Sequence, residues 1–170
     1  MEDAPEISPV HDEPRVSLVR LTPILADTGR PVPETVAATL VNAGRHRLVA
    51  RKTDSGHWTL PDLVLAVFIE AEWEQLNKQL ELIMELVDGQ NRPAYLRSGP
   101  DNGGEVARIR SWVTVGPVPG APDGMPGRLT HLWEFRAGSL WIPAPGRRYV
   151  WQCSIGEDRG RFGFWVAAPS

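Results

Sequence analysis

Residues 63–73 read Leu-Val-Leu-Ala-Val-Phe-Ile-Glu-Ala-Glu-Trp. Every odd position of this segment is apolar, whereas the even positions change from apolar to acidic, ending in Glu70 and Glu72. Successive side chains of a strand point to opposite faces of its sheet. The pattern therefore predicts a strand that is buried on both faces at its start and solvated on one face at its end.

Further alternating segments follow along the chain, separated by glycine and proline. They cover residues 16–25 (a first strand broken by Pro23), 94–97, 106–115, 129–135, 139–142, 149–155 and 162–166, with a hairpin turn at 156–160. Short alternating strands with this punctuation are typical of β-sandwiches. The sequence predicts an all-β fold, a two-sheet antiparallel sandwich with one short helix.

Residues 79–88 fit two patterns. Leu80, Leu82, Met84 and Leu86 alternate as in a strand, but a helical stripe ending before Gly89 also passes through this segment. We interpret the segment as a strand, partly because of the family resemblance described below.

The one short helix is expected within residues 33–44. Pro33 and Glu34 would occupy its first turn, and Gly44 would follow its end. Val36, Leu40 and neighbouring residues would form one apolar stripe.

The chain of 170 residues, 42% of them hydrophobic, suits a single domain. Residues 15–170 are assigned to that β-sandwich domain. Residues 1–14 are acidic and contain three prolines, which indicates a flexible or partner-docked N-terminal tail. The segment 116–127 holds four prolines and four glycines and is expected to be a loop crossing between the sheets.

Composition argues against several partners. The net charge of −3 gives no basic footprint for nucleic acid. No apolar run approaches the length of a membrane span, so no membrane partner is expected. The N-terminal residues do not resemble a signal peptide, and the single cysteine, Cys153, cannot form an internal disulfide. The expected location is the cytoplasm, or a virion if the protein is phage-encoded.

No cofactor or metal site is expected. The histidines lack the paired spacing of metal ligands, and the one conceivable grouping is His46 and His57 with Asp54 across a hairpin. Cys153 lies between Trp151 and Ile155 on an apolar strand face, where cysteine is usually inert. Neither a nucleophile elbow nor a P-loop occurs.

Paired carboxylates are the one candidate for catalysis. Glu70 and Glu72 share a strand face at about 7 Å, which is near a glycosidase separation, and Glu81 and Glu85 could lie nearby. A strand that leaves the core is more typical of a solvated face, so we expect no catalytic residues.

The sequence contains seven tryptophans. Trp73, Trp133 and Trp151 fall on apolar faces and are expected in the core. The candidates for an interface or ligand site are Trp112 and Trp165 on polar strand faces, their neighbours Arg110 and Arg161, and Trp141 in an apolar edge segment. Tryptophan and arginine are enriched at interfaces, although sugar stacking or a second small core under a loop or helix would also use such residues.

Several short pieces of the sequence recur together in one family. They are Ile24-Leu25-Ala26-Asp27, Trp73-Glu74-Gln75-Leu76-Asn77, Leu80-Glu81-Leu82, Leu86-Val87-Asp88-Gly89, Gly116-Pro117-Val118-Pro119-Gly120, and Pro145-Gly146-Arg147-Arg148-Tyr149-Val150-Trp151 before Ile155-Gly156. In their order and spacing the chain resembles a family of small β-sandwich proteins of unknown function found in actinobacteria and their phages. The resemblance implies a compact sandwich and a strand at 79–88, but no activity. The acidic extension 1–14 and the insert before Arg45 depart from the family and could bind a specific partner.

These observations favour a non-enzymatic structural or interaction protein. It would self-associate, as a homo-oligomer, or dock onto a larger assembly through Trp112, Trp141 and Trp165; a capsid-decorating virion component is one form of this hypothesis. The alternatives are a small-molecule or carbohydrate-binding module and an enzyme that uses the paired carboxylates.

Overall fold

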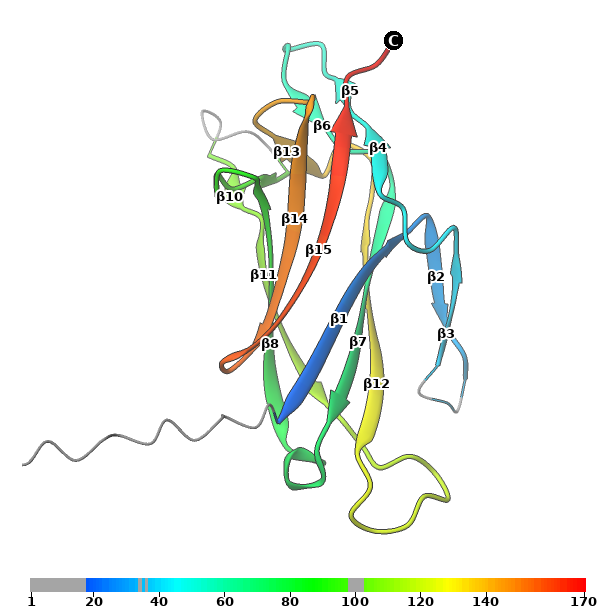
Figure 1. Cartoon of the computed structure of the whole chain (residues 1–170). Helices are drawn as coiled ribbons and strands as arrows, with labels where there is room; N and C mark the ends of the chain where they lie inside the picture. Colours follow the sequence, from blue (N-terminus) through cyan, green and yellow to red (C-terminus); the bar gives the residue numbers. More distant parts are fainter. Residues whose placement is uncertain (1–17, 34, 36, 98–102) are drawn as a thin grey trace, which may run out of the picture.

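The computed structural model describes residues 18–33, 35, 37–97 and 103–170. Two sheets pack against each other, as the sequence predicts, and their strands are antiparallel except for one parallel pair at an edge of the larger sheet (Figure 1). The small sheet has the order β1 (Val19–Ala26), β7 (Leu63–Ala71), β12 (Gly127–Phe135). The large sheet has the order β11 (Arg108–Thr114), β8 (Gln79–Asp88), β14 (Arg147–Ile155), β15 (Asp158–Ala167), β4 (Arg47–Val49). The all-β sandwich and the strand at 79–88 are confirmed.

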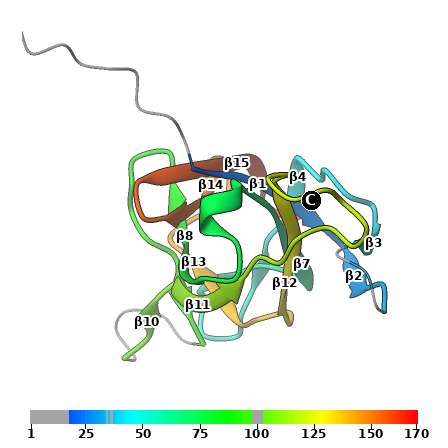
Figure 2. The ribbon, with the colours of Figure 1, turned by 90° about the horizontal axis from the view of Figure 1, so that it is seen from below.

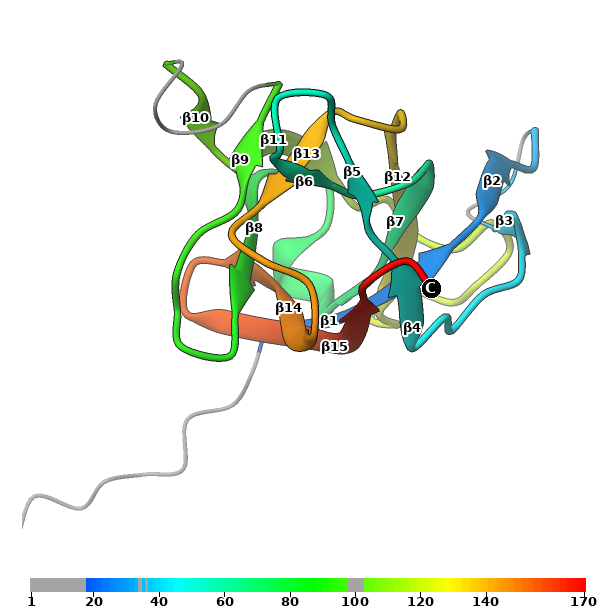
Figure 3. The ribbon, with the colours of Figure 1, turned by 90° about the horizontal axis from the view of Figure 1, so that it is seen from above.

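A third sheet of short strands covers one end of the sandwich (Figure 3). Its order is β10 (Glu105–Val106), β9 (Tyr95–Leu96), β13 (Leu140–Ile142), β6 (Trp58–Thr59), β5 (Arg51–Lys52). Residues 139–142 were expected at an edge, but β13 lies between two strands because its apolar Leu140 and Ile142 are buried over the end of the core.

The prediction of a short helix at 33–44 is wrong. The chain instead forms an antiparallel hairpin of β2 (Thr28–Pro31) and β3 (Ala38–Val41), which stands on the outer side of β7 and β12 (Figures 1 and 2). The physical reason is tertiary: Leu40 faces Gly29, against Val64 and Leu132 of the small sheet. Strand alternation turns Leu40 toward the small sheet, where it is half-buried, and leaves Thr39 and Val41 exposed; such β-branched residues suit a strand.

The core lies between the two main sheets. The odd residues of β7, from Leu63 to Ala71, face the inner residues of β8, β14 and β15. Val64 and Ala66 are buried on the outer side, where Gly29 and Leu40 of the hairpin lie against Val64, whereas Phe68 is exposed. The prediction that β7 is buried on both faces only at its start is confirmed.

One side of the sandwich is closed where β1 crosses β15. A Cβ atom on Gly160 would lie 2.4 Å from the carbonyl oxygen of Leu21, so the two backbones touch at that glycine. The N–H of Val19 donates to Asp158 Oδ2 at 2.9 Å beside this crossing.

The predicted break at Pro23 is wrong, because β1 runs unbroken through it. Glu72 N–H donates to Leu18 C=O at 3.0 Å, which places the backbone bonds to β7 at even-numbered residues of β1. Pro23 is odd-numbered, and the backbone groups of odd-numbered residues of β1 point away from β7. The N–H that proline lacks is therefore not needed for the hydrogen bonds between β1 and β7.

Two tryptophans also differ from expectation. Trp151 is fully buried, as predicted, but Trp73 is 42% exposed and Trp133 is half-buried against the core. Strand β7 ends at Ala71, and Trp73 begins the short 3-10 turn Trp73–Gln75, so strand alternation no longer directs its side chain inward. The predicted acidic tail, residues 1–14, lies outside the described residues.

Candidate interaction surface

The outer face of the large sheet gathers most of the candidate residues. Alternation on the four long strands directs one set of side chains to solvent, and we call this set the arginine–tryptophan face. Its charged, amide and tryptophan members are Arg108, Arg110 and Trp112 on β11, Gln79, Glu81 and Glu85 on β8, Arg148 and Gln152 on β14, and Arg159, Arg161 and Trp165 on β15. The aliphatic Ile83, Val87 and Val150 lie on the same face.

Strand register arranges these residues in rows. Arg108 lies opposite Glu85, Glu85 opposite Gln152, and Gln152 opposite Arg161. An ion pair joins Arg110 Nη1 to Glu81 Oε1 at 3.5 Å. The five arginines of this face, at positions 108, 110, 148, 159 and 161, outnumber its two glutamates. The face is therefore locally positive, although the net charge of the chain is −3.

Trp112 and Trp165 are exposed, at 61% and 47%, as the sequence predicts. They nevertheless occupy opposite corners of the face. Trp112 pairs with Glu81, whereas Trp165 pairs with Arg148, whose carbonyl receives the N–H of Gly89. Positions 81 and 89 are about 27 Å apart along the strand, and three strand spacings add about 14 Å across it. The two rings are therefore roughly 30 Å apart and cannot grip one small ligand.

Trp141 does not belong to this face. It lies on β13 in the sheet that covers the end of the sandwich, where its ring is half-buried and packs 5.0 Å from the His57 ring. Its indole N–H donates to Gly138 C=O at 3.0 Å. The structure thus brings together Trp112, Trp165, Arg110 and Arg161 on one face, and separates Trp141 from them.

The paired carboxylates do not converge. Glu70 contacts Arg128 at 3.0 Å and Arg20 at 3.6 Å on the outer face of the small sheet, and Glu72 is exposed beyond the end of β7. Glu81 and Glu85 lie on the outer face of the other sheet, so the expectation that they are near Glu70 is wrong. Solvent-exposed, arginine-paired carboxylates are typical of surface ion pairs.

The histidines proposed to meet across a hairpin are separate as well. His46 stacks on Phe162 at 5.2 Å, while His57 packs on Trp141. Among the residues that the structure describes, no group of three or more histidine, cysteine, aspartate or glutamate side chains could hold a metal ion.

Cys153 is fully buried, and burial raises the pKa of its thiol to about 12. We expect native protein at pH 8 to react with a thiol reagent at least ~100-fold more slowly than protein unfolded in urea, because the reactive thiolate is scarce and inaccessible. Absorbance of the released thiol chromophore measures both rates. Rapid stoichiometric labelling of the native protein would contradict the prediction.

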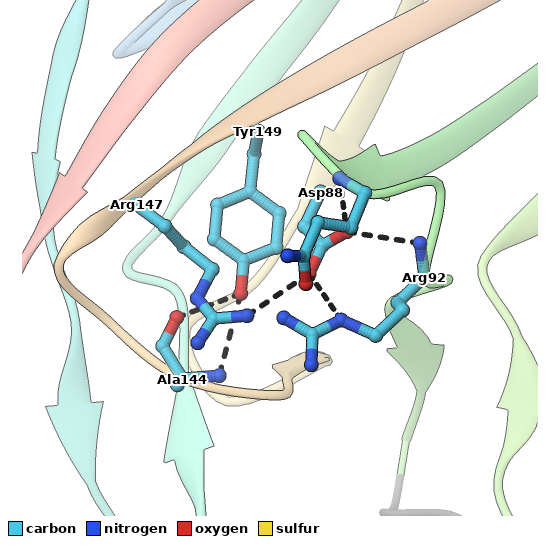
Figure 4. Close-up of polar contacts among 6 residues, drawn as sticks. Asp88, Arg92, Ala144, Arg147 and Tyr149 are labelled. Carbon is cyan, nitrogen blue, oxygen red and sulfur yellow. Dashed lines mark hydrogen bonds and ion pairs between the residues drawn. The ribbon is translucent and has the colours of Figure 1, made fainter.

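The most elaborate polar cluster in the described chain, centred on Asp88, was not predicted from the sequence. Asp88 is 1% exposed at the end of β8 (Figure 4). Its Oδ1 accepts the backbone N–H groups of Gln90 and Arg92, both at 2.9 Å. Its Oδ2 accepts Arg92 Nε at 2.7 Å and Arg147 Nη1 at 3.1 Å.

Tyr149 lies beside this carboxylate. Its hydroxyl donates to Ala144 C=O at 2.7 Å, and burial raises its pKa to about 12 (Figure 4). Three of these bonds close the turn after β8 and the fourth, from Arg147, ties the turn to β14, so the cluster is structural. A recognisable signal was available in the sequence: an aspartate that opens a turn, with an arginine four residues later.

No helix within the described residues has the length and apolar character needed to cross a membrane. The fold and its surface define an all-β sandwich that presents a positive, tryptophan-bearing sheet face. Comparison with known proteins finds no family model and no curated protein that matches the chain.

Proposed function

We propose that this protein is a non-enzymatic interaction protein that docks onto a larger assembly, or self-associates, through the arginine–tryptophan face. The observation that carries the proposal is the exposure of Trp112 and Trp165 on one sheet face among arginines. Leaving two large aromatic rings in water is costly, and tryptophan with arginine is the pair most enriched at interface hot spots.

The layout of the face suits a broad protein contact. The rings lie roughly 30 Å apart with charged and amide side chains between them, which is the scale of a standard protein interface rather than of a small-molecule pocket. A virion component is one form of the proposal and rests on the family resemblance alone. The separation of the rings counts against a single sugar site, and the ion pairing of Glu70 counts against general acid catalysis.

The proposal is tested by the solution mass of the wild type and of three variants, Trp112→Ser, Trp165→Ser and Trp73→Ser, by size exclusion with light scattering. Trp73 is the matched control because it is similarly exposed but lies outside the face. We expect the first two substitutions to weaken association at least ~30-fold, as for a hot-spot tryptophan, and the third to leave it unchanged.

The same comparison with residues 1–14 removed shows whether the acidic segment contributes. Equal association of all three tryptophan variants would contradict the use of this face. A wild type that is monomeric at every concentration would remove the self-association form of the proposal and leave docking onto another protein.

A further inference from the structure

The small sheet has one long open edge, and it lies on β12. Within the described chain, β12 pairs with β7 on one side and with no strand on the other. A long strand with an unpaired row of N–H and C=O groups is a template for pairing with another strand.

The other edges of the two main sheets are protected. On the open side of β1, Val19 N–H donates to Asp158 and Leu25 C=O accepts the N–H groups of Gly44 and Arg45. Strand β4 has only three residues, Arg47–Val49. Strand β11 carries exposed charges of one sign only, Arg108 and Arg110, so pairing with a second copy would bring like charges together.

The open backbone groups of β12 can be assigned. Even-numbered residues of β7 bond β1, as Glu72 N–H to Leu18 C=O shows, so the odd-numbered ones bond β12. Their partners in β12 are also odd-numbered, for example His131 opposite Val67. The backbone groups of the even residues, Arg128, Thr130, Leu132 and Glu134, therefore point away from the sheet.

Side chains around this edge are only partly covered. Leu129 and Trp133 face inward but are half-buried. Strand β12 approaches the chain that follows β11 closely at its first residue, where a Cβ on Gly127 would lie 2.3 Å from the carbonyl oxygen of Gly116, but β12 and β11 do not pack along their length as β1 and β15 do. His131, between them, has a buried Nε2 with no hydrogen-bond partner in the described structure. Glu134 has no ion-pair partner there either, whereas Arg128 shares Glu70 with Arg20.

We propose that a second copy of this chain pairs antiparallel along the open edge of β12, on a two-fold axis beside His131. In this register Arg128 lies opposite Glu134 of the second copy at both ends of the contact, and Thr130 lies opposite Leu132. Each of these pairs exchanges two backbone hydrogen bonds. Leu129 lies opposite Trp133 of the second copy, so apolar side chains that are half-exposed in one copy meet across the axis.

Charge and the proline at position 126 together select this register over its neighbours. A shift by two residues in one direction places Glu134 opposite Pro126, which has no N–H to donate. A shift in the other direction places Arg128 opposite Arg136, and like charges directly opposite are unfavourable. Only the register centred on residue 131 pairs both charges with their opposites. This contact goes beyond the proposed function because it uses a different surface and leaves the arginine–tryptophan face free.

The first test uses two charge variants, Arg128→Glu and Glu134→Arg, with light scattering as the measurement. Each alone places like charges opposite one another at both ends, and we expect the dimer dissociation constant to rise at least ~10-fold. An equimolar mixture of the two variants restores both attractions, so we expect a heterodimer, detected by capture of the untagged variant on the tagged one. Recovery in the mixture excludes misfolding as the cause.

The second test is a cysteine on the axis. His131→Cys places two thiols opposite one another at a non-hydrogen-bonded pair, with Cα atoms about 4.5 Å apart, which suits a disulfide. We expect an intermolecular disulfide on mild oxidation, resolved by non-reducing electrophoresis. Leu129→Cys is the matched control, since position 129 meets 133 rather than itself and stays unlinked; the native Cys153 is buried.

The outcomes separate this inference from the proposed function. Edge pairing would be overturned by any of three results. The dimer dissociation constant could be insensitive to both charge substitutions, or the mixture of the two variants could associate no more tightly than each variant alone. The third result is a wild type that is monomeric at millimolar concentration. Loss of association in Trp112→Ser or Trp165→Ser without any effect of the charge variants would overturn edge pairing while supporting the tryptophan face. Sensitivity to the charge variants alone would support edge pairing without the face.

Discussion

Gly160→Ala is expected to lower the free energy of unfolding by about 3 kcal/mol, measured by urea denaturation. A Cβ at this position would lie 2.4 Å from the carbonyl oxygen of Leu21 and 2.9 Å from its carbonyl carbon and Cβ. The obstacle is backbone, which cannot rotate aside as a side chain can. On its other side Gly160 is held by its ladder partner Cys153. Strands β1 and β15 would have to separate where the two sheets meet.

Gly163→Ala on the same strand is the matched control. The atoms nearest to its Cβ belong to the Arg148 guanidinium, at 2.3–2.8 Å, and this side chain lies on the solvent face and can move. We expect a change within about 1 kcal/mol of zero, because replacing a strand glycine also reduces the entropy of the unfolded chain. Equal destabilisation by the two substitutions would show that close approach of β1 is not what Gly160 provides.

The long strands were predictable because alternation is a property of the chain itself. Residues 63–71, 79–88 and 149–155 carry apolar side chains at every second position, and each forms a strand of a main sheet. The exposure of Trp112 and Trp165 followed from the same rule, since each shares a strand face with an arginine. Sequence could therefore predict the face on which the candidate residues lie.

Features that depend on distant parts of the chain were not predictable. Residues 38–41 form a strand because β2 pairs with them and the outer side of β7 receives Leu40, and neither partner is visible in the local sequence. The distance between Trp112 and Trp165 depends on how β11, β8, β14 and β15 are ordered and registered. The open edge of β12 likewise became visible only once its single partner was known.

Asp88→Asn is expected to lower the free energy of unfolding by about 3 kcal/mol at neutral pH. The buried carboxylate accepts two backbone N–H groups and two guanidinium groups, and an amide offers one oxygen where two are needed. The NH2 group of the asparagine would then face the N–H donors that bond the second carboxylate oxygen in the wild type. The cost is moderated because Arg92 and Arg147 are partly exposed and can recover water contacts.

Asp27→Asn is the control for a surface carboxylate. Asp27 also contacts an arginine, Arg45, together with Asn42, but about a third of its side chain is exposed. Exposed pairs contribute at most about 1 kcal/mol, so we expect a loss of that size or less. A loss at Asp27 as large as that at Asp88 would show that burial of the Asp88 cluster adds nothing.

The difference in the free energy of unfolding between wild type and Asp88→Asn should also depend on pH, and it should shrink as the pH falls. Burial is the largest influence on the Asp88 carboxyl and opposes its charge, but the N–H groups of Arg92 and Gln90 and the Arg92 guanidinium together hold its pKa below the ordinary 3.8. A depressed pKa contributes stability that is fully present above the unfolded-state pKa and is lost as the pH falls through the folded-state value. We therefore expect the stability difference to be constant from neutral pH down to about pH 5 and to shrink below about pH 4, where the unfolded chain binds a proton before the folded carboxylate does. The difference is lost once the folded carboxyl is protonated as well and resembles the amide. Urea unfolding of both proteins across this range measures it, and a difference that stays constant or grows in acid would show that the ionised carboxylate is not what fastens the turn to β14.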